Sequence, residues 1–268
     1  MNLTYDLVVS IKEKLVYQFL QPKFDTPLQN LNQNTILLAT KWQLLSHFLI
    51  DEDTLPLIAE KGHLETVKWL YKNAYKRPFV KIAIYASDWS DYPIDMAAYG
   101  GHLDIVEWLY SVGEGYTTFA MDYAAINGHL DVVRWLHSKG ASCTKLAFDG
   151  AASAGNLEIL KWLAENRHEG CSNSIFKNND EILPSIYKFV LKRYPYTFHP
   201  NVIVMCARRG DLETLQELWQ QRTTEWTIYT GNRPNGLRFY YTTSAYVEAG
   251  KAGHVSVVLW FIQNRLIV

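Results

Sequence analysis

A single phrase, with a glycine at its centre, returns along the chain and constrains what the chain can fold into. Its clearest copy is A-A-I-N-G-H-L-D-V-V-R-W-L, around Gly128. Further copies surround Gly62, Gly101, Gly155, Gly210 and Gly253. These glycines follow one another at steps of 39, 27, 27, 55 and 43 residues. A period between about 20 and 50 residues is typical of repeat proteins, in which one helix pair cannot bury its apolar face alone and stacks on the next.

The phrase predicts two short helices that meet at the glycine. Before Gly128, the small residues Ala124 and Ala125 let a first helix lie close to its neighbour. After it, the apolar residues of a second helix fall on one face, at Leu130, Val132, Val133 and Leu136. The glycine suits the end of the first helix because it reaches positive φ without the penalty of a Cβ atom.

The residue after the glycine is expected to cap the second helix. It is His63, His102, His129, Asn156, Asp211 or His254 in successive copies. All three residue types can accept a hydrogen bond from a free N–H group at a helix start. A shared metal site is excluded, because stacked helices lie about 8 to 10 Å apart whereas zinc needs nitrogen ligands at about 2.0 to 2.1 Å. We therefore predict caps here and no metal.

The 55-residue step indicates one degenerate copy, since it is close to twice the 27-residue period. The segment from Glu181 to Arg193 has the apolar spacing of a second helix. The prediction is therefore seven helix pairs.

The consensus A-A-x-x-G-H-L-[DE]-[VI]-V-x-W-L resembles the ankyrin repeat over about residues 55–261. The 27-residue period and the tryptophan are similar to a short variety found in amoebae, giant viruses and oomycetes. The sequence lacks the T-P-L-H motif of the better-known form and has Asp95, Asp122 and Asp149 where that form has its histidine. The resemblance implies an all-α ankyrin-repeat solenoid over residues 54–268.

Two insertions interrupt the array, near residues 74–93 and 222–243. In the second, the β-type runs T-E-W-T-I-Y-T and L-R-F-Y-Y-T flank G-N-R-P-N-G, which has the composition of a hairpin loop. We predict an inserted β-hairpin that stands out from the stack. Insertions on one face of a repeat protein tend to mark its binding face.

Residues 1–53 do not carry the repeat phrase. The segment from Tyr5 to Leu20 and that from Thr35 to Ile50 have helical apolar spacing. One reading is a helical cap for the end of the array. The other interpretation is a divergent F-box. The stretches D-L-V-V-S-I and A-T-K-W loosely resemble the two ends of an F-box, although the opening Leu-Pro of that module is missing.

Composition and motifs favour a non-enzymatic, cytoplasmic protein. The net charge of −1 gives no general attraction to nucleic acid or anionic membranes. Three cysteines without metal-type spacing indicate reduced thiols, and no apolar run is long enough for a membrane span. No catalytic or cofactor motif occurs, and we expect no cofactor. The aspartates should accept backbone N–H groups, and the repeated Trp69, Trp108, Trp135, Trp162 and Trp260 should be core or half-exposed residues and not a ligand cage.

The resemblance implies a protein partner on the concave side, formed by the loop tips and the last residues of each first helix. These residues vary between copies while their flanks repeat, as a solvent-facing stripe should. Aromatic and arginine side chains dominate interface hot spots. The predicted binding residues are Trp89, Tyr92, Tyr99, Tyr116, Ile126, Asn127, Arg208, Arg209, Trp226, Tyr229 and Arg233. The alternative function is a substrate adaptor of a ubiquitin ligase that acts through an F-box-like N-terminus.

The last copy departs from the pattern at Leu259. The same repeat position is charged in the clear copies, as Lys68, Glu107, Arg134 and Lys161. Because the apolar Ile262, Leu266 and Ile267 follow, we expect a cover over this end of a monomeric chain. The expected cover is the hairpin, through Trp226, Ile228, Leu237 and Phe239. A second copy of the chain and further repeats are the alternatives.

Overall fold

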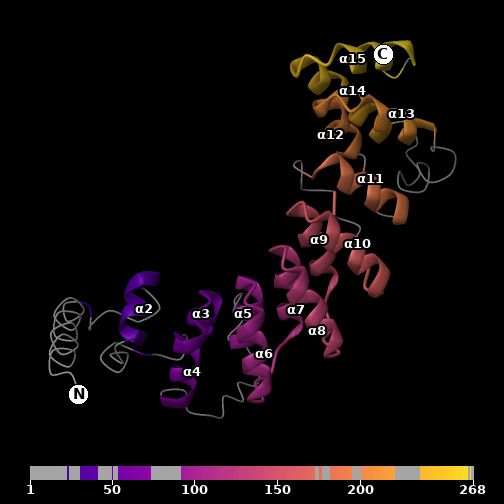
Figure 1. Cartoon of the computed structure of the whole chain (residues 1–268). Coiled ribbons are helices and arrows are strands. Elements are labelled where there is room, and N and C mark those ends of the chain that lie inside the picture. Colours follow the sequence, from indigo (N-terminus) through magenta and orange to yellow (C-terminus); the bar gives the residue numbers. More distant parts are fainter. Residues whose placement is uncertain are drawn as a thin grey trace, which may run out of the picture. The chain divides into compact units, whose positions relative to one another are not determined.

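The computed structural model describes residues 23, 31–41, 50, 54–73, 92–172, 175–176, 182–194, 199, 201–220, 236–264 and 266, with the side chains of 236–242 excepted (Figure 1). Within these residues the secondary structure is helical and contains no strand. The chain divides into two compact units, residues 1–143 and 144–268, which we treat separately. The segments near 1–30 and 42–53, and with them the choice between a cap and an F-box, lie largely outside the described residues.

The described part of the first unit contains three complete helix pairs. Its helices are α2 (Gln33–Lys41), α3 (Thr54–Glu60), α4 (Leu64–Asn73), α5 (Pro93–Gly100), α6 (Leu103–Ser111), α7 (Thr118–Ile126) and α8 (Leu130–Ser138). The first helices α3, α5 and α7 pack on one another in order, and the second helices α4, α6 and α8 form a parallel row. Ala97, Ala98, Ala124 and Ala125 are completely buried. The prediction of small residues at the close contacts between helices is therefore confirmed.

The second unit continues the pairing. Its helices are α9 (Lys145–Ser153), α10 (Leu157–Asn166), α11 (Pro184–Arg193), α12 (Asn201–Arg209), α13 (Leu212–Gln220), α14 (Gly236–Lys251) and α15 (Val255–Gln263). The first helices α12 and α14 make the largest contact of this unit. Helix α11 lies where the degenerate copy was predicted to have its second helix, and Pro184 occupies its first turn. That prediction is confirmed.

One of the two segments predicted as hairpin strands is helical, so the strand prediction is wrong for it. The run L-R-F-Y-Y-T, residues 237–242, forms the start of α14. The preference of aromatic residues for strands depends on context, and here the run continues directly into a first helix that packs against α12. The other run, including Trp226, and the first insertion near 74–93 lie outside the described residues, so the inserted hairpin is not shown.

The glycine between the two helices of a pair is required for two reasons. Gly101 has φ +77°, and its N–H bonds to the carbonyls at the end of α5. A Cβ atom at Gly62 or Gly101 would also come within 3 Å of the imidazole of His102 or His129, which belongs to the next pair. Any other residue would be strained at this φ and would collide with the next pair.

The cap prediction is wrong for four of the residues that follow a repeat glycine. The side chains of His102, His129, Asn156 and His254 make no cap hydrogen bond in the described structure. Instead, Nε2 of His102 lies 2.9 Å from the carbonyl oxygen of Glu60 in the preceding pair, and Nε2 of His129 lies 3.1 Å from that of Tyr99. The backbone φ and ψ at His129 are −89° and 73°, outside the extended region typical of caps. Each imidazole therefore links two pairs.

Asp211 does act as a cap. Its carboxylate accepts a hydrogen bond of 3.1 Å from the backbone N–H of Thr214, and Asp211 also accepts one from the Thr214 hydroxyl. The same repeat position thus caps a helix where the side chain is a short carboxylate. It reaches the preceding pair where the side chain is an imidazole.

Two of the three aspartates of the first helices, Asp95 and Asp149, bind backbone N–H groups in the next loop, as predicted. The carboxylate of Asp95 is completely buried and accepts hydrogen bonds from the N–H, at 2.9 Å, and the hydroxyl of Thr117. Asp149 accepts a hydrogen bond of 3.0 Å from the N–H of Ser172. These carboxylates are therefore structural links.

The repeated tryptophans are half-buried on the second helices. Tyr71 packs edge-to-face on Trp108 of the next pair at 5.4 Å between ring centres, and Tyr110 packs on Trp135 at 5.3 Å. In the second unit, Trp219 contacts Trp260 in the same way at 6.0 Å. These contacts follow one another from pair to pair, and the prediction that the tryptophans are core or half-exposed residues is confirmed.

We predict that His102→Ala lowers the free energy of unfolding by about 1 to 2 kcal/mol, because it leaves the Glu60 carbonyl without its imidazole donor. Urea denaturation measures this value. The exposed His168→Ala serves as the control and should stay within about 0.5 kcal/mol of the parent protein. An equal effect of both changes would contradict the link between pairs.

Replacing Ala124 by leucine should destabilise the protein by about 1 to 3 kcal/mol, because this completely buried methyl group lies in a first helix packed on its neighbour. Thermal and urea unfolding followed by circular dichroism measure the loss. Ser153→Leu, at an exposed last position of the first helix α9, is the matched control and should change little. A neutral Ala124→Leu variant would show that the interface between α5 and α7 can expand.

Candidate protein-binding surface

Three aromatic side chains gather on the first helices of unit 1. Phe119 stacks on Tyr123, one helical turn later in α7, with ring centres 5.4 Å apart and an angle of 14° between the rings. Tyr99, at the end of α5, packs edge-to-face on Tyr123 at 5.5 Å. We call these three residues the inner aromatic cluster. Phe119 is 40% exposed and the two tyrosines are half-buried, so the cluster presents ring surface to solvent.

Polar bonds hold the backbone of this cluster in place. The carbonyl oxygen of Tyr99 lies 2.9 Å from the amide nitrogen Nδ2 of Asn127 and 3.1 Å from the imidazole of His129. The N–H of Phe119 donates to the hydroxyl oxygen of Thr117 at 3.1 Å, which caps α7. Thr117 in turn donates to the buried Asp95. The rings are therefore presented on a fixed backbone.

A cluster of this kind suits the binding of another protein. Tyrosine and phenylalanine supply large contact areas and lose little conformational entropy when a partner binds. A backbone that is already fixed before binding reduces the ordering cost further. The tyrosine hydroxyl groups can also exchange hydrogen bonds with a polypeptide.

Four of the predicted binding residues lie on or at the ends of α5 and α7, the two helices that carry this cluster. Tyr99 belongs to it, and Asn127 is exposed and bonds to the Tyr99 carbonyl. Ile126 and Tyr92 are half-buried, at the end of α7 and the start of α5. Together they lie on the two neighbouring first helices that carry the cluster.

Tyr116 has a different environment. Its hydroxyl group lies 3.3 Å from the carbonyl oxygen of Lys139, and its ring lies 6.2 Å from that of Tyr110. The ammonium group of Lys139 also lies over the rings of Tyr110 and Trp135. Burial raises the pKa of the Tyr116 phenol, and the neighbouring Tyr110 adds to the effect. Tyr116 therefore contacts the second helices α6 and α8 and stabilises the loop between pairs.

The predicted basic spot in unit 2 is used within the fold. Nε of Arg208 donates to the carboxylate of Glu248 at 3.2 Å, and Arg209 donates to the carbonyl oxygen of Ile182. The pKa of the Glu248 carboxyl is lowered mainly by its hydrogen bond with Lys251 and further by Arg208. The remaining predicted residues, Trp89, Trp226, Tyr229 and Arg233, lie outside the described residues.

Phe119 and Tyr123 were missed by the sequence analysis, which considered only the last residues of each first helix. They lie nine and five residues before Gly128. The position of Tyr123 is Met96 in the preceding copy and Gly150 in the following one. Because Met96 is buried, variation among the copies does not by itself mark this position as solvent-facing. The spacing of four residues between Phe119 and Tyr123, which makes them neighbours on one helix, is the signal that could have found this aromatic pair.

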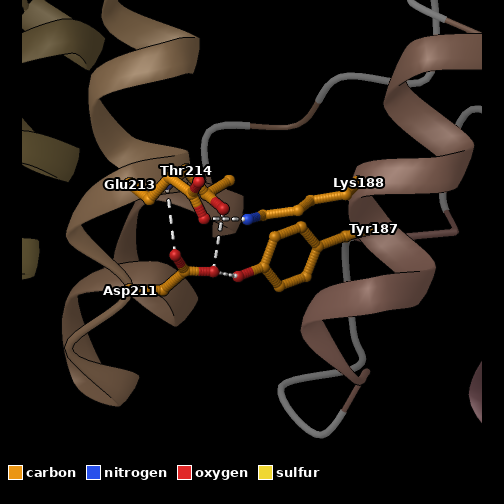
Figure 2. Close-up of polar contacts among 5 residues, drawn as sticks. All are labelled: Tyr187, Lys188, Asp211, Glu213 and Thr214. Atoms are coloured by element: carbon orange, nitrogen blue, oxygen red, sulfur yellow. Dashed lines mark hydrogen bonds and ion pairs between the residues drawn. The ribbon is translucent and has the colours of Figure 1, made fainter.

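A polar network links α11 to the start of α13 in unit 2 (Figure 2). The phenol of Tyr187 donates to the carboxylate of Asp211, which also accepts from Thr214. Lys188, the next residue of α11, forms an ion pair with Glu213, with 2.8 Å between its Nζ and the carboxylate oxygen. Burial alone would raise the pKa of the Asp211 carboxyl, but hydrogen bonds from Tyr187 and Thr214 outweigh it and lower the pKa. This network joins α11 to the start of α13.

The described residues offer little for metal or covalent chemistry. Among them, no group of three or more His, Cys, Asp or Glu side chains could hold a metal ion. Cys143, Cys171 and Cys206 are buried and form no disulfide with one another. Burial raises the pKa of the Cys206 thiol to about 12, which suppresses the reactive thiolate. No described helix is both long enough and apolar enough to cross a membrane.

Comparison with known families identifies the repeats. Residues 55–147 and 94–176 match the family model described as "Ankyrin repeats (3 copies)". A search of curated proteins finds no match. The helix pairs between residues 55 and 176 are therefore similar to ankyrin repeats, which in general are protein–protein interaction modules.

The Asp211 network predicts a pH dependence. Because the folded-state pKa of this carboxyl lies below its ordinary value of 3.8, its stabilising contribution is present above that pH and is lost as the pH falls through the lower folded pKa. Asp211→Asn should therefore destabilise the protein near neutral pH, and its deficit relative to the parent protein should shrink on acidification. Urea denaturation across a pH series measures this deficit. The control Asp104→Asn, at an exposed aspartate in the first turn of α6, should show a smaller deficit at every pH.

Proposed function

We propose that this chain is a non-enzymatic interaction module that binds a protein partner through the inner aromatic cluster and the neighbouring ends of α5 and α7. The observation that carries the proposal is the ring surface that the exposed Phe119 and the half-buried Tyr99 and Tyr123 present to solvent, beside the Tyr99 carbonyl that His129 and Asn127 bind. In ankyrin arrays this face of the first helices is the concave side.

The opposite side of the same pairs is less suited to binding. The second helices expose residues of mixed charge at one repeat position, with Glu107 in α6 and Arg134 in α8. Surface charges of both signs are well hydrated, and charged residues are depleted in interface cores. Exposed aromatic rings lose unfavourable contact with water when a partner covers them. The first helices therefore offer the stronger contribution to affinity.

Site-specific photocrosslinking tests this proposal. A benzoylphenylalanine residue at position 119 should capture discrete protein species in the cell, because its ring would lie in the interface. The same residue at position 134, on the exposed face of α8, is the matched control and should capture little. Tyr123→Ala, introduced together with the probe at 119, should reduce the captured amount by about tenfold or more, as expected for an aromatic hot spot.

Equal capture at positions 119 and 134 would overturn the proposal, as would capture at 119 that Tyr123→Ala leaves unchanged. Circular dichroism of each variant separates loss of binding from loss of folding. A retained helical spectrum and melting temperature are required before a loss of crosslinking is counted.

A further inference from the structure

Helix pair α14/α15 exposes more apolar surface than the other pairs. Val247 in α14 is 43% exposed, and Val255, Leu259 and Ile262 in α15 are 66%, 49% and 49% exposed. The three residues of α15 are spaced four and three apart, so they form one line along the helix, which we call the α15 stripe. An exposed line of large apolar residues on a helix marks a binding surface.

Two of these residues, Val255 and Ile262, occupy repeat positions that the following pair covers elsewhere. The position of Val255 is a half-buried leucine in the other pairs, for example Leu103. The position of Ile262 is Tyr110 in α6 and Trp219 in α13, whose rings pack on the next pair. Val255 and Ile262 therefore belong to the surface on which one pair stacks on another.

Leu259 is different, because its repeat position is not covered by a following pair. The corresponding residues Glu107, Lys161 and Gln216 are exposed although α8, α11 and α15 follow them. A further ankyrin repeat stacked on α15 would therefore still leave Leu259 in water. A partner that buries the whole stripe must lie along α15 itself and reach its outer side.

The chemistry of α15 indicates what this partner is. The other second helices that carry the clear repeat phrase have an acidic residue in the first turn, at Glu65, Asp104, Asp131, Glu158 and Glu213. Helix α15, V-S-V-V-L-W-F-I-Q, has no charged residue at all. Two copies of such a helix can meet across a two-fold axis without bringing like charges together. The spacing of four and three residues between the members of the α15 stripe also suits packing of one helix on another.

We propose that a second copy of this chain covers the α15 stripe, so that two chains associate in a symmetric dimer through their α15 helices. Leu259 lies at the centre of the contact and faces its own counterpart near the two-fold axis. The inner aromatic cluster lies in the other unit of the chain, so this dimer does not depend on the function proposed for that cluster.

Sedimentation equilibrium of the full chain tests the proposal. The parent protein should sediment as a dimer in the micromolar range. Leu259→Glu should raise the dimer dissociation constant by about 100-fold or more, because a two-fold axis buries the new carboxylate twice. The monomer should keep its helical spectrum and melting temperature. Gln216→Glu, at the same repeat position of α13, is the matched control and should leave the dimer unchanged.

Oxidative crosslinking locates the contact. Leu259→Cys should form a disulfide-linked dimer under mild oxidation, whereas Gln216→Cys should not. The natural cysteines are buried, so they contribute little background.

Three results would each overturn the proposal. The first is a parent protein that stays monomeric up to high micromolar concentration. The second is a dimer that survives Leu259→Glu. The third is a Leu259→Glu variant that remains monomeric like its parent but melts at a lower temperature, which would show that the chain covers its own stripe.

Discussion

The contact between an imidazole ring and the glycine of the preceding helix pair is the interaction on which the stacking depends. The ring of His102 lies directly against Gly62, where no Cβ atom fits, and reaches the carbonyl of Glu60. His129 repeats this arrangement on Gly101, and His254 repeats it on Gly210. Glycine is thus needed because it adopts positive φ and because it leaves room for the imidazole ring where a Cβ atom would lie. The imidazole satisfies a carbonyl group that the end of a helix leaves without a partner.

Where this contact is missing, other groups join the pairs. At the start of α11 the histidine is replaced by Leu183, whose side chain touches the position of a Cβ on Gly155 and offers no hydrogen bond. At the next junction the position of the histidine is Asp211, and α11 is joined to α13 by the Tyr187–Asp211 bond and the Lys188–Glu213 ion pair (Figure 2). Both bonds cross between second helices, whereas the imidazole reaches a first helix. Helix α11 is therefore held on α13 by side-chain contacts that differ from those of the clear copies.

The same contact also shapes the candidate binding surface. The imidazole of His129 stacks one pair on the next, and the carbonyl that it binds belongs to Tyr99 of the inner aromatic cluster. Asn127 adds a second donor to that carbonyl and stands at an exposed end of α7. The bonds that hold the pairs together thus also fix the aromatic rings that a partner would meet. A fixed surface of this kind binds without the entropy cost of ordering a loop.

The sequence by itself determined the repeat, the helix pairs, the buried alanines and the need for glycine at each turn. These features are local or periodic, and internal copies report them without any three-dimensional information. Only the tertiary structure decided that the imidazole bonds to the preceding helix pair. A helix cap and a link between pairs would both place a histidine at this position of the repeat, so the sequence pattern does not distinguish them. It also decided that residues 237–242 are helical, since packing of α14 on α12 outweighs the strand preference of their aromatic side chains. The contact of Tyr99 with Tyr123 likewise appears only when α5 and α7 lie side by side, because contacts between helices depend on distances that a one-dimensional pattern does not contain.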